Sequence, residues 1–162
     1  MAITFNADEI FGIGEQIERN GEKFYTLSAQ RVADPKAKKV LQDLAGMERN
    51  HLKVFQDLHA QIDQAAVEET TWDPDGEGPA YLQATADSHI FRSTDDPTTL
   101  LADAADPKEI LELALRFEKD SVVFFLGASD MVPERLGKDD VMKLAKQEQQ
   151  HIVVIQRALS QL

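Results

Sequence analysis

Glu48-Arg49-Asn50-His51 is the stretch that decides the fold, because its Glu-x-x-His pattern returns as Glu148-Gln149-Gln150-His151. The stretches around the two tetrads align at an offset of 100 positions without a gap. The residues shared at that offset are Glu18 and Glu118, Phe24 and Phe124, Leu44 and Leu144, Ala45 and Ala145, Val54 and Val154, and Gln56 and Gln156. The chain therefore contains two copies of one unit, each carrying a lone glutamate and then a Glu-x-x-His.

The composition excludes several classes of protein. With 162 residues the chain is long enough to bury a core, and we expect a single domain over residues 1–162. It has no cysteine, which excludes disulfides, thiolate zinc sites, iron–sulfur clusters and a cysteine nucleophile. The net charge of -12 argues against nucleic acid or an anionic membrane as a partner. No apolar run approaches membrane-spanning length and no signal-peptide pattern opens the chain, so we expect a soluble cytoplasmic protein.

Helix signals surround the first copy of the unit. Asn6 followed by Glu9 forms a capping box, which predicts a helix that continues to about Arg31. Asp34-Pro35 is an N-cap with proline at the first helical position, so the next helix begins at once. The short link predicts an antiparallel hairpin over about residues 6–64, whose second helix is expected to fray near Gln64.

The second copy has the same signals. Asp106-Pro107 predicts a third long helix, which continues to about Met131. After a turn, a fourth helix is predicted from about Lys138 to the end of the chain. These two helices form a second hairpin over about residues 106–162.

The connector, about residues 65–105, joins the two hairpins. Residues 70–79 are rich in turn formers, whereas residues 80–89 and 98–105 each predict a short helix. A connection of this length can carry the chain from one end of a bundle to the other, so the third long helix would run parallel to the second. We therefore predict an all-α fold, a four-helix bundle with one long crossover between helices 2 and 3.

The repeated glutamates and histidines lie on the apolar faces of these helices. Residues i and i+3 share one helix face, so Glu48 and His51 reach one point, as do Glu148 and His151. Buried carboxylates without a partner are costly, and no lysine or arginine shares their face. Two divalent cations would balance four carboxylates, and oxygen with imidazole ligands suits iron or manganese. The residues predict a metal pair; a repeat that kept these residues and lost its metal is the alternative.

Other residues near the predicted site receive smaller roles. Gly14 and Gly21 lie about one turn on either side of the first lone glutamate, and because glycine costs helix stability they indicate a need for space. Tyr25 could hydrogen-bond a ligand carboxylate or take part in electron transfer, but its repeat counterpart is a phenylalanine, which favours plain packing against the site. His59 and His89 lie off the repeat and are predicted to be exposed or capping, without a role at the site.

The same residues resemble the rubrerythrin family of the ferritin-like superfamily. The resemblance covers nearly the whole chain and is carried by residues 18–25, 44–51, their second-half counterparts, and 81–91. It implies a non-haem di-iron site, with manganese or a mixed pair as alternatives, that reacts with hydrogen peroxide or dioxygen. The ligands it implies are Glu18, Glu48, His51, Glu118, Glu148 and His151. In this arrangement the lone glutamates are single-helix ligands, the glutamates of the tetrads bridge or chelate, and each histidine caps one metal.

Two departures from that family bear on the activity. Rubrerythrins carry a rubredoxin-like domain with four cysteines, and this chain has no cysteine, so turnover would need an external electron-donor protein. They also have an additional carboxylate one turn beyond the lone glutamate of the third long helix. That position is Ser121 here, and Gly21 is its counterpart in the first helix. Glu15 or Glu22, each within about a turn of Glu18, would be the substitute.

The leading functional hypothesis is an oxidoreductase that reduces hydrogen peroxide at a di-iron site with electrons from a separate carrier. The alternatives are a ferroxidase that handles iron, a dimanganese catalase, and a non-enzymatic metal-binding bundle. A homodimer is expected.

Overall fold

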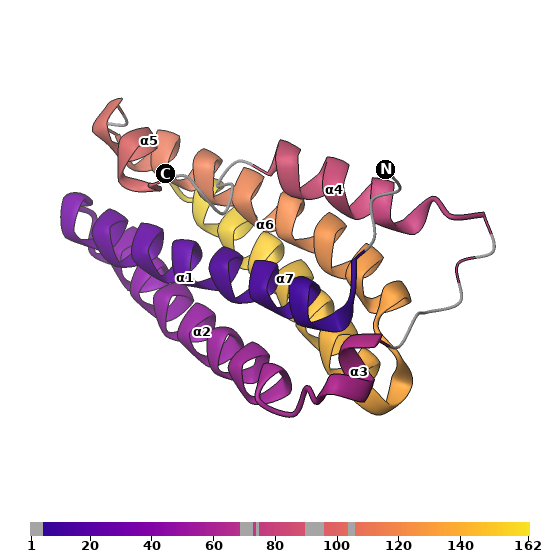
Figure 1. Cartoon of the computed structure of the whole chain (residues 1–162). Coiled ribbons are helices and arrows are strands. Elements are labelled where there is room, and N and C mark those ends of the chain that lie inside the picture. The colour runs from indigo at the N-terminus through magenta and orange to yellow at the C-terminus, as the bar shows by residue number, and fades with distance from the viewer. Residues whose placement is uncertain (1–4, 69–72, 74, 90–95, 104–105) are drawn as a thin grey trace.

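Four long helices form the body of the molecule (Figure 1). The computed structural model describes residues 5–68, 73, 75–89, 96–103 and 106–162. The long helices are α1 (Ala7–Arg31), α2 (Pro35–His59), α6 (Pro107–Met131) and α7 (Lys138–Leu159). The shorter elements are α3 (Gln64–Glu68), α4 (Gly78–Ser88), α5 (Thr98–Asp103) and the 3-10 turn η1 (Glu134–Leu136). Within those described ranges there is no strand, which confirms the predicted all-α class.

The predicted helix starts are confirmed by their caps. The Asn6 side chain accepts a hydrogen bond from the Glu9 backbone N–H at 2.9 Å, and the Glu9 carboxylate accepts one from the Asn6 N–H at 3.1 Å. Asp34 caps α2 through the Ala37 N–H at 2.8 Å, and Asp106 likewise caps α6. Each cap satisfies backbone donors that the first turn of a helix leaves without a partner.

The predicted end of the second helix is wrong. α2 ends at His59 rather than near Gln64. The Asp63 side chain accepts a hydrogen bond from the Ala66 N–H at 2.8 Å, so Asp63 starts the separate short helix α3. The chain thus leaves the helix after His59 and begins a new helix after Asp63, whose side chain caps the first turn.

The hairpin α1–α2 packs against the hairpin α6–α7, and the connector crosses the bundle lengthwise (Figure 1). α4 lies along α6, where the Tyr81 hydroxyl donates to the Val123 carbonyl at 3.2 Å. α5 lies at the opposite end of the bundle from α3, held there by a hydrogen bond from Arg31 to the Leu101 carbonyl. As predicted, the crossover makes α6 run parallel to α2.

Buried aromatic rings pack in the core on either side of the repeated glutamates. Phe55 packs against Phe11 and Phe125, with ring centroids 6.3 and 5.2 Å apart. Further along the bundle, Tyr25 meets Phe117 edge-on at 5.9 Å. All five rings are fully buried, and burying each stabilises the fold by roughly 1.5–3 kcal/mol.

In the described part of the chain, none of the helices combines the length and the apolar character needed to cross a membrane.

Candidate metal centre

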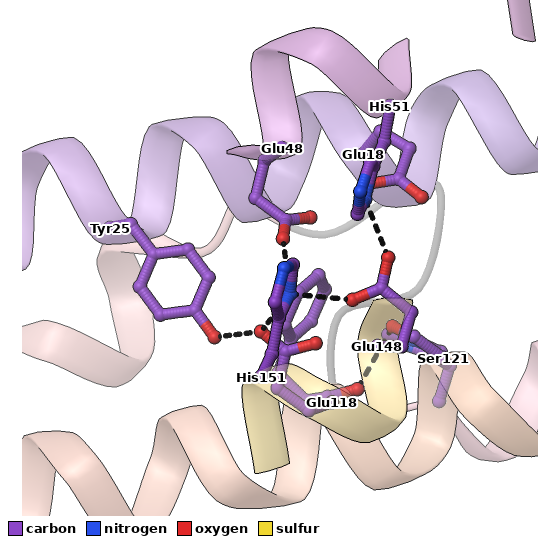
Figure 2. Close-up of polar contacts among 10 residues, drawn as sticks. Glu18, Tyr25, Glu48, His51, Glu118, Ser121, Glu148 and His151 are labelled. Atoms are coloured by element: carbon purple, nitrogen blue, oxygen red, sulfur yellow. Dashed lines mark hydrogen bonds and ion pairs between the residues drawn. The ribbon is translucent and has the colours of Figure 1, made fainter. Parts of the chain in front are cut away.

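Each of the four long helices contributes to one cluster at the centre of the bundle (Figure 2). α1 supplies Glu18 and α6 supplies Glu118, while α2 and α7 each supply a Glu-x-x-His pair. All four carboxylates are 0% exposed, and the two histidine residues are 5% and 3% exposed. The structure therefore brings together all six residues singled out in the sequence.

Both histidines contact the carboxylate of Glu148. Its Oε1 lies 2.6 Å from His51 Nδ1, and its Oε2 lies 2.9 Å from His151 Nδ1. The two imidazole rings are nearly parallel, with an interplanar angle of 7° and centroids 5.2 Å apart. Across the cluster, His151 Nδ1 lies 3.3 Å from Glu48 and 3.4 Å from Glu118.

The ligand atoms fall into two overlapping groups. In each group one atom per residue lies within 4.8 Å of all the others. The first group contains Glu18 and His51, and the second contains Glu118 and His151. Glu48 and Glu148 belong to both groups. This is the arrangement that two adjacent cations with two shared carboxylates require.

Most carboxylate oxygens of the cluster lack the hydrogen-bond partners that buried oxygens normally have, which suits them to bind metal ions. Both oxygens of Glu18, Glu48 and Glu148 lack a hydrogen bond of regular geometry, as does one oxygen of Glu118. In the described ranges, the carboxylates of the cluster form ion pairs with its own two histidines and with no lysine or arginine. Such groups are costly to bury unless a cation completes them.

The pKa values within the cluster are strongly displaced. Burial, followed by the charges of neighbouring carboxylates, raises the pKa of Glu18 and of Glu118 well above the ordinary value. Burial alone would lower the pKa of His151, but its contacts with three carboxylates raise that pKa to about 12. Burial alone would also raise the pKa of Glu148, yet the two imidazoles hold it far below its usual range. Without metal, protons thus supply part of the positive charge, and metal binding would release them.

Tyr25 is more than a packing residue: the structure shows the hydrogen bond to a carboxylate of the cluster, the alternative that the sequence disfavoured. Its hydroxyl, fully buried, donates a hydrogen bond to Glu118 Oε1 (Figure 2). Burial and then the Glu118 charge raise the pKa of Tyr25, so the phenol keeps its proton and remains a donor. The repeat comparison missed this contact because Tyr25 reaches a partner 93 positions away.

His89 was predicted to be exposed or capping, and it is at a cap position but not exposed. It follows α4 at the C-cap position and is 3% exposed. Its Nε2 lies 3.1 Å from the Ser121 hydroxyl, and its ring meets Phe117 edge-on at 5.5 Å. No periodicity marks this histidine; the one signal was its place within residues 81–91, of which 90 and 91 lie outside the described residues.

The space predicted around Glu18 is present. A Cβ on Gly21 would lie 2.7 Å from Glu48 Oε2 and 2.6 Å from the Phe117 ring. A Cβ on Gly14 would lie 2.7 Å from the Phe55 ring. The two glycines therefore let a carboxylate and two aromatic rings approach α1 closely.

Neither substitute carboxylate reaches the cluster. Glu15 pairs with His59 Nδ1 at 2.7 Å and with Arg19 at 3.5 Å. Glu22 accepts a hydrogen bond from Arg49 Nε at 2.7 Å. Both carboxylates thus form ion pairs outside the two ligand groups.

A surface pocket between α2 and α7 reaches the two histidines of the cluster. Its volume is about 270 Å³, and both histidines form part of its wall. Its other lining residues carry no charge: Met47, Asn50, Gln147, Gln150 and Val154.

The architecture and the cluster together define a ferritin-like helical bundle. A solved structure from Thermotoga maritima, described as "a putative ferritin-like diiron-carboxylate protein", is similar to this chain with a TM-score of 0.73. The match covers 96% of this chain and 95% of the other, at 21% sequence identity. At that identity the likeness establishes the fold, and it confirms the predicted ferritin-like bundle. No protein-family model and no curated protein matches the chain.

Proposed function

We propose that the cluster holds two iron ions and that the chain is a di-iron carboxylate protein. The observation that carries this proposal is the convergence of four fully buried carboxylates and two histidines, which form no ion pair with a lysine or arginine among the residues that the structure describes. Two divalent cations would supply four positive charges, which balance the four negative charges of the carboxylates. Carboxylate oxygen with imidazole nitrogen suits iron or manganese better than magnesium or calcium. The description of the Thermotoga protein as a diiron-carboxylate protein supports iron.

The residues divide between the two ions according to their groups. Glu18 and His51 would hold one ion, and Glu118 and His151 the other. Glu48 and Glu148 would be shared, because each lies within reach of both groups. Both histidines present Nδ1 to the cluster, the atom that would bind the metal.

We propose that the reaction is the reduction of hydrogen peroxide with electrons from a separate donor protein. Two ferrous ions held by these residues would each supply one electron, and two electrons with two protons convert one hydrogen peroxide to two molecules of water. The chain excludes bulk water from the carboxylates, which have no exposed surface. It also provides an uncharged pocket beside the histidines, which suits a small neutral oxidant better than an anion.

The expected homodimer stays a prediction, which light scattering on a sizing column tests.

The test begins with metal loading of the purified chain. Metal-free protein loaded with ferrous iron is expected to retain two ions per chain by elemental analysis. Mixing with peroxide should then change the absorption spectrum faster than mixing with dioxygen. Glu148→Ala should abolish both metal retention and the spectral change. Glu22→Ala, which removes a carboxylate of the same helical bundle outside the cluster, should preserve them.

Other outcomes identify the alternatives. Faster oxidation by dioxygen, together with assembly into a large shell, would indicate a ferroxidase. Manganese in protein from its own source, with peroxide disproportionation, would indicate a dimanganese catalase. Metal that raises thermal stability while peroxide leaves the spectrum unchanged would indicate a structural pair.

A further inference from the structure

The two ligand groups are related by the sequence repeat but differ in the support of their lone glutamates. Glu118 Oε1 accepts the hydrogen bond from Tyr25. Glu18 has no hydrogen bond of regular geometry at either oxygen. The nearest histidine nitrogen to Glu18 in its group, His51 Nδ1, lies 3.6 Å away. Glu118 is therefore oriented by a hydrogen bond from a residue outside the cluster, whereas the polar contacts described for Glu18 come from within the cluster, from Glu48 and His51.

The difference arises from a single position of the repeat. Tyr25 on α1 reaches across to the glutamate of α6 (Figure 2). Its counterpart on α6 is Phe125, which is fully buried and packs against Phe55 at 5.2 Å. A phenylalanine has no hydroxyl, so the second half of the chain offers no equivalent donor to the glutamate of α1. The aromatic packing is kept in both halves, whereas the hydrogen bond is made in one.

We propose that the two metal positions differ in affinity and that the position formed with Glu118 and His151 fills first. Tyr25 is the positioning residue responsible for this difference. This inference rests on the proposed metal pair and adds the order in which its two positions fill. Mixed-metal occupancy follows from it, because the second position exchanges its ion more readily than the first.

The physical reason is the orientation of the carboxylate before the metal arrives. Tyr25 restricts Glu118 to one direction, so less conformational freedom is lost when an ion binds there. Glu18 has no donor of this kind among its described contacts, so more of its orientation must come from the ion. Removing a hydrogen-bond partner of a metal ligand commonly weakens metal affinity by about 10–100-fold. We expect an affinity difference of that size between the two positions.

The experiment is a manganese titration of the metal-free full chain. Free Mn²⁺ gives a six-line electron paramagnetic resonance signal that is lost on binding, so its intensity reports each binding step. Two cations a few ångströms apart repel each other, so stepwise binding is expected even for two equal positions. The position that the first ion occupies is what distinguishes unequal from equal positions. Crystals grown with one equivalent of Mn²⁺ should therefore show anomalous scattering at the position formed with Glu118 and His151.

Two variants complete the test. Tyr25→Phe should weaken the first binding step about 10–100-fold and spread the single equivalent over both positions. The matched control is Tyr81→Phe, which removes an exposed hydroxyl bonded to the Val123 carbonyl and should leave both steps unchanged. Thermal unfolding of the metal-free variants separates loss of folding from loss of metal affinity.

The outcomes are distinct. Even occupancy of both positions in the wild-type crystal, or a first ion beside Glu18, would overturn the inference while leaving the metal pair intact. An unchanged first step in a folded Tyr25→Phe chain would also overturn it. Failure of the wild-type chain to bind Mn²⁺ or Fe²⁺ more tightly than Glu148→Ala would instead remove the proposed function itself.

Discussion

Replacing Gly21 by alanine tests whether the space beside the cluster is needed. The new Cβ would lie 2.6 Å from Phe117 Cζ and 2.7 Å from Glu48 Oε2. Favourable carbon contacts lie at about 3.5–4.0 Å, so the ring must move by about 1 Å. Both neighbours are 0% exposed and have little room to yield. Overpacking of this kind costs about 1–3 kcal/mol.

A gain in helix propensity opposes that cost. Alanine is better than glycine inside a helix by about 1 kcal/mol, so the net loss for Gly21→Ala is about 0–2 kcal/mol. Gly12 lies in the same helix, and a Cβ there would meet nothing within 4 Å. Gly12→Ala should therefore gain roughly 0.5–1 kcal/mol. The difference between the two variants isolates the steric cost, because the propensity terms cancel.

The assay is thermal unfolding of the two metal-free variants, followed by circular dichroism. For a chain of this size 1 kcal/mol corresponds to roughly 2–4 °C, so Gly21→Ala should melt several degrees below Gly12→Ala. It should also weaken binding of both metal ions, because the displaced Glu48 belongs to both ligand groups. A Gly21→Ala chain that melts as high as Gly12→Ala and binds two ions normally would refute the reasoning.

Three further predictions concern metal, pH and the connector. Removing metal with a chelator should lower the unfolding temperature, since an ion at 100 times its dissociation constant stabilises the fold by about 2.7 kcal/mol per site; equal melting with and without chelator would contradict this. Burial alone would lower the pKa of His59, but its hydrogen bonds with Glu15 at 2.7 Å and Asp8 at 2.9 Å raise it. That stabilisation is fully present below the unfolded-state pKa of about 6.5 and is lost as the pH rises through the folded-state value. In urea unfolding, His59→Gln should therefore cost more at pH 5.5 than at pH 9, and a cost independent of pH would count against the ion pairs. His89→Ala should destabilise the chain by roughly 2 kcal/mol through a cavity and a lost hydrogen bond, and limited proteolysis should cut the connector faster; unchanged cleavage would argue against a role for His89 in docking it.

The sequence alone determined the elements whose signals are local. The capping box of Asn6 and Glu9 and the Asp-Pro starts involve neighbouring residues, so they mark helix beginnings directly. The repeat of a lone glutamate and a Glu-x-x-His follows the period of the helix, so it predicted which side chains share a buried face. These two kinds of signal were enough to predict the helical bundle and the six residues that the structure brings together in the cluster.

Tertiary structure decided whatever depends on contacts between distant segments. The hydrogen bond from Tyr25 to Glu118 crosses from α1 to α6, and the contact of His89 with Ser121 depends on how the connector docks. The partners of Gly21 come from α2 and α6. None of these contacts has a periodicity along the chain, because each is set by the packing of whole helices rather than by residues a few positions apart. The two halves of the repeat are therefore alike in their proposed ligands and differ in the groups that hold those ligands in place.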